Sequence, residues 1–556
     1  MVINVLAPGR GSPAKLQTRF ALKQDRWNDF GFQTLYHLYF QSEHGDPKPT
    51  LIGSVKILRE RQTGADGIQI SEPFESLGPQ FCSVGTSLDY YARLSEITEQ
   101  DRDGILDALR DVVANKQLQL NFRQEEGWRV SLFRDNDDIE GFLADATAIY
   151  AHRYTDLAKL DEAIQFYPAG WSDPINLDFD AADPYFYFGR KRSIGPSGRQ
   201  VLLPRRIVVV IGRNGSGKST LLARIARVAF AAPSDRKLRV LQDVGSFQPS
   251  SIGFPRIIAI SYSGFDNFSV PAAYDTDLDQ IASDIDRGAG RYVYAGLRDI
   301  AAEARDELSL LQERDKNLDR RVLLRGNERS DSTKLKSVEH LADEFVRLIA
   351  QIEAEDGLSL FDAALAPLLA DASFSDLDGR SRYALLGDDP KASFMSWSTG
   401  HKIALHVIAS IVATATRRAL VLFDEPETHL HPPLVAALMH AIRIVLEEKN
   451  AFALVATHSP VVLQETLAQH VRIIHRAGDS FSVEQPKAET FGENAGILTQ
   501  TIFGLTSAAT DYHHVLDLLI ENFDTVEQVN ELFSPGLSAQ ALGYVMAGLA
   551  RKERKE

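Results

Sequence analysis

Cysteine is almost absent from this sequence: Cys82 is the only one among 556 residues. An intramolecular disulfide is therefore impossible, and so is a zinc site built from several cysteines. Long apolar runs are missing too, because no segment approaches the ~18 uncharged apolar residues of a membrane span. The first residues lack the apolar stretch of a secretion signal. We therefore expect a cytoplasmic protein that does not partner a membrane.

An excess of positive charge is lacking as well. The formal net charge is −16, which argues against a protein that coats nucleic acid with a broad basic surface, although a local basic groove stays open. The composition is otherwise that of a globular protein, with 44% hydrophobic and 24% charged residues. A chain of this length predicts two to four domains.

Four short apolar runs predict a parallel β-sheet. Each is rich in β-branched or other apolar residues and is followed by polar ones; they are Ile207–Ile211, Ile257–Ile260, Leu420–Phe423 and Phe452–Ala456. Such runs suit strands that helices cover on both faces, although any single run could be a buried helix segment. Ligands bind at the carboxyl ends of the strands in these sheets. We therefore predict an α/β fold with a ligand site at that edge.

The segment that starts at Ile207 has the order strand, G-x-x-x-x-G-K-S and helix, which is typical of a phosphate-binding loop. Its glycines allow tight turns that bring backbone N–H groups to phosphate oxygens. Lys218 would reach the β and γ phosphates of ATP, and the Ser219 hydroxyl would bind Mg²⁺. A glycine-rich turn that binds nothing is the alternative, but the apolar strand and helix on either side favour a nucleotide. The predicted ATP contacts in this loop are Gly212, Arg213, Asn214, Gly215, Ser216, Gly217, Lys218, Ser219 and Thr220.

Two carboxylates follow the third apolar run directly, in Leu420-VLFDEPETHLHP. Asp424 would hold Mg²⁺, directly or through water. Glu425 would act as the general base that polarises the attacking water. An ordinary strand-to-loop turn also uses Asp, Glu and Pro, so this assignment depends on the phosphate loop that precedes it.

Two further segments complete the pattern. Trp397-STGHKIALHVIASIVA is a Ser/Gly turn that opens an apolar helix, and its free N–H groups would suit a phosphate. Taken alone, it is more often a plain N-cap. Phe452-ALVATHSPVV places His458 at a strand end, where it could contact the γ phosphate and the water; a lone histidine there is usually structural.

The order of these four motifs resembles the ABC ATPase superfamily. In that family two heads enclose two ATP molecules. The resemblance implies that Ser398 and Gly400 contact the γ phosphate on the opposite subunit, that His458 is the switch histidine, and that Glu427-THLHP crosses the dimer interface. One departure concerns the strand Ile257–Ile260, after which the family usually has a Gln near Mg²⁺. This chain continues with Ser261-YSGFDNF, so Ser261 or Asp266 would have to substitute.

The resemblance covers about Leu177 to Arg476 and predicts the division of the chain. We expect an α+β accessory domain at 1–175, with strands near Phe30–Gln41 and Thr50–Leu58 and a helix near Ile139–Asp156. ABC ATPase lobe I, with the phosphate loop, would occupy 176–270. A helical insertion would follow at 271–390, with helical spacing in Arg291–Leu311 and Val338–Ile352. Lobe II would occupy 391–500 and a C-terminal helical region 501–556.

The D-E-P-E-T-H-L-H-P string resembles the ATPases of overcoming-lysogenisation nucleases and of bacterial anti-phage systems. No D-x-D metal motif follows Pro460, which argues against a fused Toprim nuclease. By resemblance, the chain is then similar to the ATPase subunit of Septu or retron-linked defence systems, which act with a separate HNH-type nuclease.

The competing hypothesis is a RecF-like repair ATPase that clamps duplex DNA with its insertion. The basic residues of 314–336, among them Arg320, Arg321 and Arg325, could contact phosphates of DNA or msDNA. Interspersed acids are instead typical of a solvated loop.

Overall fold

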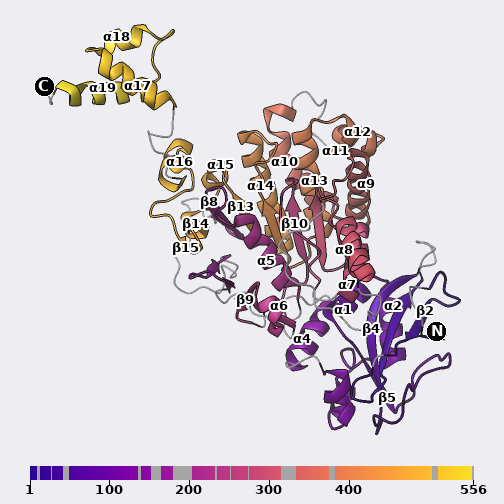
Figure 1. Cartoon of the computed structure of the whole chain (residues 1–556). Helices are drawn as coiled ribbons and strands as arrows, with labels where there is room; N and C mark the ends of the chain where they lie inside the picture. The colour runs from indigo at the N-terminus through magenta and orange to yellow at the C-terminus, as the bar shows by residue number, and fades with distance from the viewer. Residues whose placement is uncertain are drawn as a thin grey trace, which may run out of the picture. The chain divides into compact units, whose positions relative to one another are not determined.

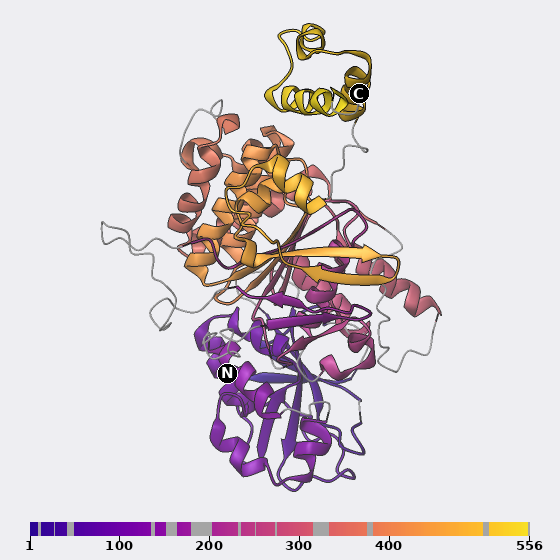
Figure 2. The ribbon, with the colours of Figure 1, turned by 90° about the vertical axis from the view of Figure 1, so that its left-hand side faces the viewer.

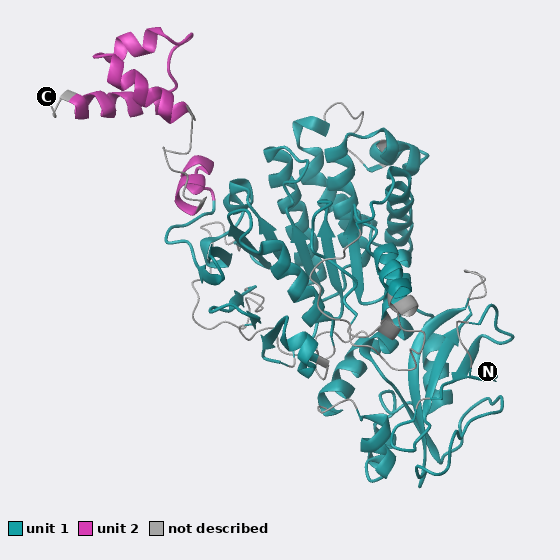
Figure 3. Cartoon of the chain, viewed as in Figure 1, with its two compact units in different colours: residues 1–491 teal, residues 492–556 magenta. Residues whose placement is uncertain are grey.

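The computed structural model is shown in Figure 1, coloured from the N-terminus to the C-terminus. It describes residues 1–8, 13–26, 28–41, 49–134, 139–151, 164–179, 203–231, 235–250, 252–272, 275–314, 333–374, 382–503 and 511–553. These residues form two compact units, 1–491 and 492–556 (Figure 3), and each is described by itself. In the described ranges, every helix is too short or too polar to cross a membrane.

The first part of unit 1 is a five-stranded sheet in the order β1-β2-β3-β4-β5, and all its neighbours are antiparallel except β1 and β2. Its strands are β1 (Ile3–Leu6), β2 (Phe20–Gln24), β3 (Leu35–Phe40), β4 (Thr50–Arg59) and β5 (Phe81–Gly85). Its helices are α1 (Leu88–Ser95), α2 (Glu99–Leu109), α3 (Lys116–Phe122), the π-helix η1 (Trp128–Leu132) and α4 (Ile139–Tyr150). Helices and sheet share one apolar core. The predicted strand Thr50–Leu58 is confirmed as β4, whereas the strand predicted over Phe30–Gln41 is shorter and begins only at Leu35, as β3.

The centre of unit 1 is a seven-stranded sheet in the order β11-β10-β12-β13-β8-β14-β15, parallel except for β15. Its strands are β8 (Ile207–Gly212), β10 (Ile257–Ser261), β11 (Tyr292–Gly296), β12 (Leu420–Asp424), β13 (Phe452–Thr457), β14 (Val471–Ala477) and β15 (Ser480–Glu484). All four predicted apolar runs are therefore strands of one sheet, and each extends one residue beyond its predicted end. The N-terminal sheet forms a separate layer beside it (Figure 2).

Helices cover both faces of the central sheet, and the five strands β11, β10, β12, β13 and β8 are buried along their whole length. One face packs on α5 (Lys218–Phe230), α7 (Asp275–Arg287) and α8 (Ile300–Arg314), with residues such as Val208 and Leu422 in the shared core. On the other face α13 (Thr399–Thr414) contacts β10 and β11 and packs against α14 (Pro432–Lys449). A three-stranded sheet, β7-β6-β9, lies beside α5; its strands are β6 (Ile164–Pro168), β7 (Ile175–Leu177) and β9 (Gly245–Gln248).

The predicted helical insertion is mainly helical, with one correction. The helical spacing of Arg291–Leu311 is wrong for its first part, because Tyr292–Gly296 form β11 and pair in parallel with β10. The run Tyr-Val-Tyr suits a strand, and an open sheet edge is available beside it. The remaining elements are α9 (Val338–Ala354), α10 (Leu358–Leu369), the 3₁₀ helix η4 (Ala372–Phe374), α11 (Arg382–Leu386) and α12 (Pro390–Ser396). The basic residues Arg320, Arg321 and Arg325 lie outside the described residues.

Several smaller helices complete the chain. In unit 1 they are the 3₁₀ helix η3 (Asp235–Lys237), α6 (Arg239–Gln242), α15 (Pro460–Gln464) and the 3₁₀ helix η5 (Ala468–His470). Unit 2 contains α16 (Ala495–Phe503), α17 (Asp511–Asn522), α18 (Val526–Glu531) and α19 (Ala539–Glu553), with a small apolar core around Leu516 and Val545. Its helical character agrees with the prediction for the end of the chain.

Two ion pairs, the first of them buried, attach the N-terminal sheet domain to the central sheet domain. Arg93 Nη2 on α1 lies 2.7 Å from Asp284 Oδ2 on α7, and both side chains are less than 10% exposed. Arg256, just before β10, contacts Glu96 at 2.8 Å. The N-terminal domain therefore lies on the helix layer next to β10, the strand that leads into the site described below.

Candidate active site

Three adjacent strands deliver the predicted site residues to one edge of the central sheet. β13 lies between β12 and β8, so Asp424 pairs in register with Ala456 and Ile211 with Thr457. Because the strands are parallel, the loops after all three begin side by side. The phosphate loop, the two carboxylates after β12 and His458 are thus brought to one edge, although more than 200 residues separate the first from the second.

The loop after β8 needs glycine at three positions. Gly215 and Gly217 have φ angles of 76° and 90°, which disfavour residues with a Cβ. A Cβ on Gly212 would lie 2.6 Å from the Ile474 carbonyl oxygen and 2.7 Å from Ser216 Oγ. The predicted tight turn is therefore present, and α5 begins directly after it at Lys218. The residues at the tip of the loop, 213–215, are exposed.

Lys218 lies folded over this loop. Its ammonium donates hydrogen bonds to the carbonyl oxygens of Gly212 at 2.9 Å and Arg213 at 3.3 Å. Burial lowers the pKa of Lys218, and the nearby carboxylates of Glu425 and Asp424 counteract this shift. A cation held among backbone carbonyls and carboxylates at a helix start can exchange these contacts for phosphate oxygens.

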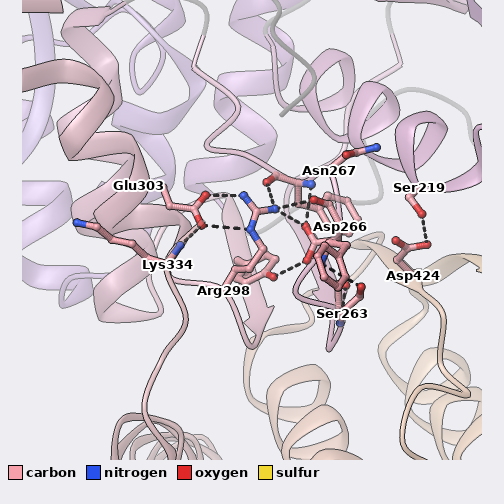
Figure 4. Close-up of polar contacts among 12 residues, drawn as sticks. Ser219, Ser263, Asp266, Asn267, Arg298, Glu303, Lys334 and Asp424 are labelled. Atoms are coloured by element: carbon pink, nitrogen blue, oxygen red, sulfur yellow. Dashed lines mark hydrogen bonds and ion pairs between the residues drawn. The ribbon is translucent and has the colours of Figure 1, made fainter. Parts of the chain in front are cut away.

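Ser219 and Asp424 form a pair of oxygen ligands. Ser219 Oγ donates to Asp424 Oδ1 at 3.0 Å (Figure 4). Burial raises the pKa of Asp424 to about 7, so this carboxylate needs a cation beside it to stay ionised at neutral pH. Mg²⁺ prefers a hydroxyl and one or two carboxylates together with phosphate oxygens. The pair fits that ion.

Glu425 leaves the strand in an unusual backbone conformation, with a φ angle of 51°. Its side chain meets His458, whose Nδ1 lies 3.6 Å from Glu425 Oε1. This contact lowers the pKa of Glu425 and raises that of His458. A carboxylate that stays ionised is able to accept a proton, so the arrangement is compatible with a general base.

Glu427 holds the two strand ends together. Both of its carboxylate oxygens accept from Thr457 Oγ1 at 2.8 Å, and one accepts from the His458 backbone N–H at 2.8 Å. His458 Nδ1 also lies 3.1 Å from Glu427 Oε1. Glu427 therefore positions His458, whereas Glu425 makes fewer contacts of this kind. From the sequence, Glu427 was predicted only as part of the interface loop, and its role in holding His458 was not predicted.

The Ser/Gly turn caps α13 and packs on the loop that follows β12. Ser398 Oγ accepts from the His401 N–H at 3.3 Å, which is the N-cap that the sequence also allowed. A Cβ on Gly400 would lie 3.2 Å from the His429 carbonyl oxygen, so glycine permits a close approach there. Ser398 is exposed in the single chain and is available to a second molecule.

Asp266 and Ser261, the two predicted substitutes for the missing glutamine, both have their side-chain oxygens occupied by protein contacts. Asp266 is 1% exposed, and its carboxylate binds Arg298 at 2.7 Å and Tyr294 at 3.0 Å. Ser261 pairs in register with Asp424, but its side chain is buried and its Oγ accepts from the Ser263 N–H. Asn267 in the same loop was not predicted, yet its amide reaches Thr220 of the phosphate loop at 2.8 Å.

An aromatic pair beside the phosphate loop was also missed. Trp171 and Phe481 stack with ring centroids 4.6 Å apart and an interplanar angle of 4°. A Cβ on Gly217 would lie about 3.5 Å from both rings. Arg476 covers Phe481 and donates to the Gly215 carbonyl oxygen at 3.1 Å. The rings come from segments 310 residues apart, so no local pattern could have found them.

Comparisons with known proteins agree with this site at the level of the domain. Residues 207–464 match the model of a family described as "AAA domain, putative AbiEii toxin, Type IV TA system". The chain is 27% identical to Protein ea59 of Escherichia phage lambda, over 93% of this chain and 92% of that protein. Residues 207–464 are therefore similar to a P-loop ATPase domain of this AAA type, and the chain has distant homology to the phage protein. The roles given to single residues stay predictions.

Proposed function

We propose that this protein hydrolyses ATP as a head-to-head dimer and that the hydrolysis cycle controls a separate nuclease in anti-phage defence. The observation that carries the ATPase part is the Ser219–Asp424 pair, 3.0 Å apart at the start of α5, with Glu425 and His458 beside it. Phosphate-binding loop, metal ligands and base thus meet at one sheet edge.

Each group has a distinct part in the proposed reaction. The loop amides and Lys218 bind the phosphates, while Ser219 and Asp424 hold Mg²⁺, which neutralises charge on the phosphate oxygens when it is bound. Glu425 accepts the proton of the attacking water. His458 orients Glu425 and the water, and Glu427 holds His458 in place.

The dimer completes the site in this proposal. Ser398 and Gly400 lie at the start of α13, and an exposed helix start offers N–H groups to an anion. Within the chain this turn packs on the loop around His429. The proposal is that a second molecule presents this turn to the γ phosphate, as the resemblance to ABC ATPases implies.

The proposed defence role rests on the similarity to the matched family and to protein ea59, and on the sequence motifs. The matching family model is named after a toxin of a type IV TA system, and the similar protein ea59 is that of a phage. The D-E-P-E-T-H-L-H-P string adds the resemblance to Septu and retron-linked ATPases, whose nuclease is a separate HNH protein.

The test is native mass determination of Glu425→Gln with and without Mg-ATP, after co-expression with the product of the neighbouring gene. We expect an ATP-dependent dimer, or a multiple of it, that carries the nuclease. ATP-dependent dimers that do not bind the co-expressed protein but bind duplex DNA would favour the repair clamp instead. A protein that stays monomeric with Mg-ATP would refute the dimer.

A further inference from the structure

The loop after β10 contacts the phosphate loop through one side chain. Asn267 Nδ2 donates a hydrogen bond to Thr220 Oγ1 at 2.8 Å. Thr220 lies in the first turn of α5, directly after Ser219. The contact therefore connects the loop after β10 to the start of α5, which would bind the phosphates. The ABC ATPases, which this chain resembles, have their glutamine after the corresponding strand.

The direction of this hydrogen bond matters for the Thr220 hydroxyl. The Asn267 amide nitrogen can only donate, so Thr220 Oγ1 acts as the acceptor. The hydroxyl then keeps its own hydrogen for a different acceptor. In the first turn of a phosphate-binding helix, a phosphate oxygen is the natural acceptor. Asn267 would thus orient Thr220 toward the nucleotide.

A buried arginine fixes the backbone on both sides of Asn267. Arg298 Nη1 donates to the carbonyl oxygen of Asp266 at 2.9 Å and to that of Phe268 at 2.9 Å. It also binds Asp266 Oδ1 at 2.7 Å. Arg298 is 1% exposed. The two residues that flank Asn267 are thereby attached to one guanidinium; Figure 4 shows Arg298 beside Asp266 and Asn267.

The other side of the Arg298 guanidinium is neutralised by Glu303 on α8. Arg298 Nε donates to Glu303 Oε1 at 3.2 Å, and Nη2 pairs with Oε2. Glu303 Oε1 accepts in addition from the backbone N–H of Lys334, which lies between α8 and α9. Two carboxylates and two carbonyl oxygens thus surround one cation, which satisfies the requirement for a buried charge.

We propose that Asn267 is the polar contact from the loop after β10 that orients Thr220 toward the nucleotide, and that Arg298 is its positioning residue. The inference rests on the proposed ATP site. It stands in place of the two candidates that the sequence suggested, because Asp266 is bound to Arg298 and Ser261 is buried with its Oγ accepting from the Ser263 N–H.

A double-mutant cycle tests the contact. Asn267→Ala, Thr220→Val and the double variant are compared with the parent by titration with a fluorescent ATP analogue, with and without Mg²⁺. Asn267 and Thr220 are both partly exposed, so these variants are expected to fold. We expect Asn267→Ala to raise the Kd about threefold to tenfold, the range for one hydrogen bond. The double variant should bind no more weakly than Thr220→Val.

The control is Tyr294→Phe. It removes the hydrogen bond from Tyr294 to Asp266 Oδ2 in the same network but leaves Arg298 and Asn267 in place. We expect lower thermal stability and an unchanged Kd. If this control changes the Kd as much as Asn267→Ala does, general destabilisation explains the effect and the inference is wrong.

Arg298→Lys tests the positioning role, because lysine keeps the charge but cannot reach both carbonyl oxygens and Glu303. We expect the same rise in Kd as for Asn267→Ala, with no further rise when the two changes are combined. If Arg298→Lys does not fold, the cycle between Asn267 and Thr220 decides alone. Additive effects in that cycle would overturn the inference, whereas a parent protein that binds no ATP would refute the proposed function itself.

Discussion

Replacing Glu425 by Gln separates the chemical step from binding and folding. The change keeps the size of the side chain and removes its ability to take up a proton. Loss of a general base lowers kcat about 10²- to 10⁴-fold, which corresponds to about 3–5 kcal/mol in the barrier. The Kd for ATP should stay within about threefold, because phosphate binding is assigned to Lys218 and the loop amides.

The structure predicts only a small effect of this change on stability. The side chains of His458 and Glu425 are 46% and 30% exposed, and ion pairs between exposed groups contribute about 0–1 kcal/mol. The φ angle of 51° at position 425 is no worse for Gln than for Glu. Thermal unfolding of the variant should therefore stay close to that of the parent, which leaves the kinetic effect interpretable.

Glu427→Gln is the matched control. Glu427 also contacts His458, but its carboxylate is occupied by Thr457 Oγ1 and the His458 N–H. Gln keeps one acceptor oxygen, so we expect a loss of stability of about 1–2 kcal/mol and a kcat within tenfold of the parent. Steady-state phosphate release measures both variants. A Glu425→Gln enzyme that keeps its turnover, or a Glu427→Gln enzyme that alone loses it, would refute the assignment of the base.

Three further changes test the phosphate loop and the N-terminal domain. Lys218→Ala should weaken ATP binding by about 100-fold or more, and retained micromolar affinity in a fluorescence titration would contradict the loop assignment. Arg93→Met removes the buried partner of Asp284 and should lower the free energy of unfolding by about 3 kcal/mol in urea titrations; an unchanged midpoint would show that the pair does not hold the domains together. Burial raises the pKa of Asp111 to about 7, so the folded protein keeps a proton that the unfolded chain releases near pH 4, and stability falls as the pH rises between these values. Asp111→Asn should therefore gain stability relative to the parent from pH 5 to pH 8, and an equal difference at both pH values would argue against this shift.

The central strands and the phosphate loop were predictable because their signals are local. A strand buried on both faces reads as an apolar run, and the loop needs glycine at fixed positions such as Gly215 and Gly217. The Ser219–Asp424 contact was predictable as well, because parallel strands bring their carboxyl ends to one edge. Strand β11 was missed, because Tyr292–Gly296 are also compatible with helical spacing and only the neighbour β10 decides between the two.

The residues that support the site left no local pattern. Arg298 acts on Asp266 from 32 positions away, and Trp171 meets Phe481 across 310 positions. A single arginine or tryptophan in a sequence does not indicate its partner, because the tertiary fold decides which distant residue lies next to it. Asn267 leaves no local signal either, because the neighbouring Asp266 is a more usual Mg²⁺ ligand than an amide.

The insertion and the ATPase core share two buried polar clusters, and both begin within three residues of the chain. The Lys334 N–H binds Glu303 and so reaches Arg298. Lys336 Nζ binds Glu344 on α9 at 2.7 Å.

The second cluster continues into α13. Glu344 lies 3.7 Å from the ring of His406 on that helix, and His406 Nδ1 lies 2.7 Å from the Tyr262 hydroxyl. Tyr262 directly follows β10. One cluster therefore ends at the phosphate loop and the other at the helix that carries Ser398. A buried polar group that loses its hydrogen-bond partner destabilises the fold. A displacement of residues 334–336 would therefore require new partners both for Glu303, in the cluster that reaches the phosphate loop, and for Glu344, in the cluster that reaches α13. Residues 334–336, which lie between α8 and α9, thus contact clusters that reach both halves of the proposed ATP site.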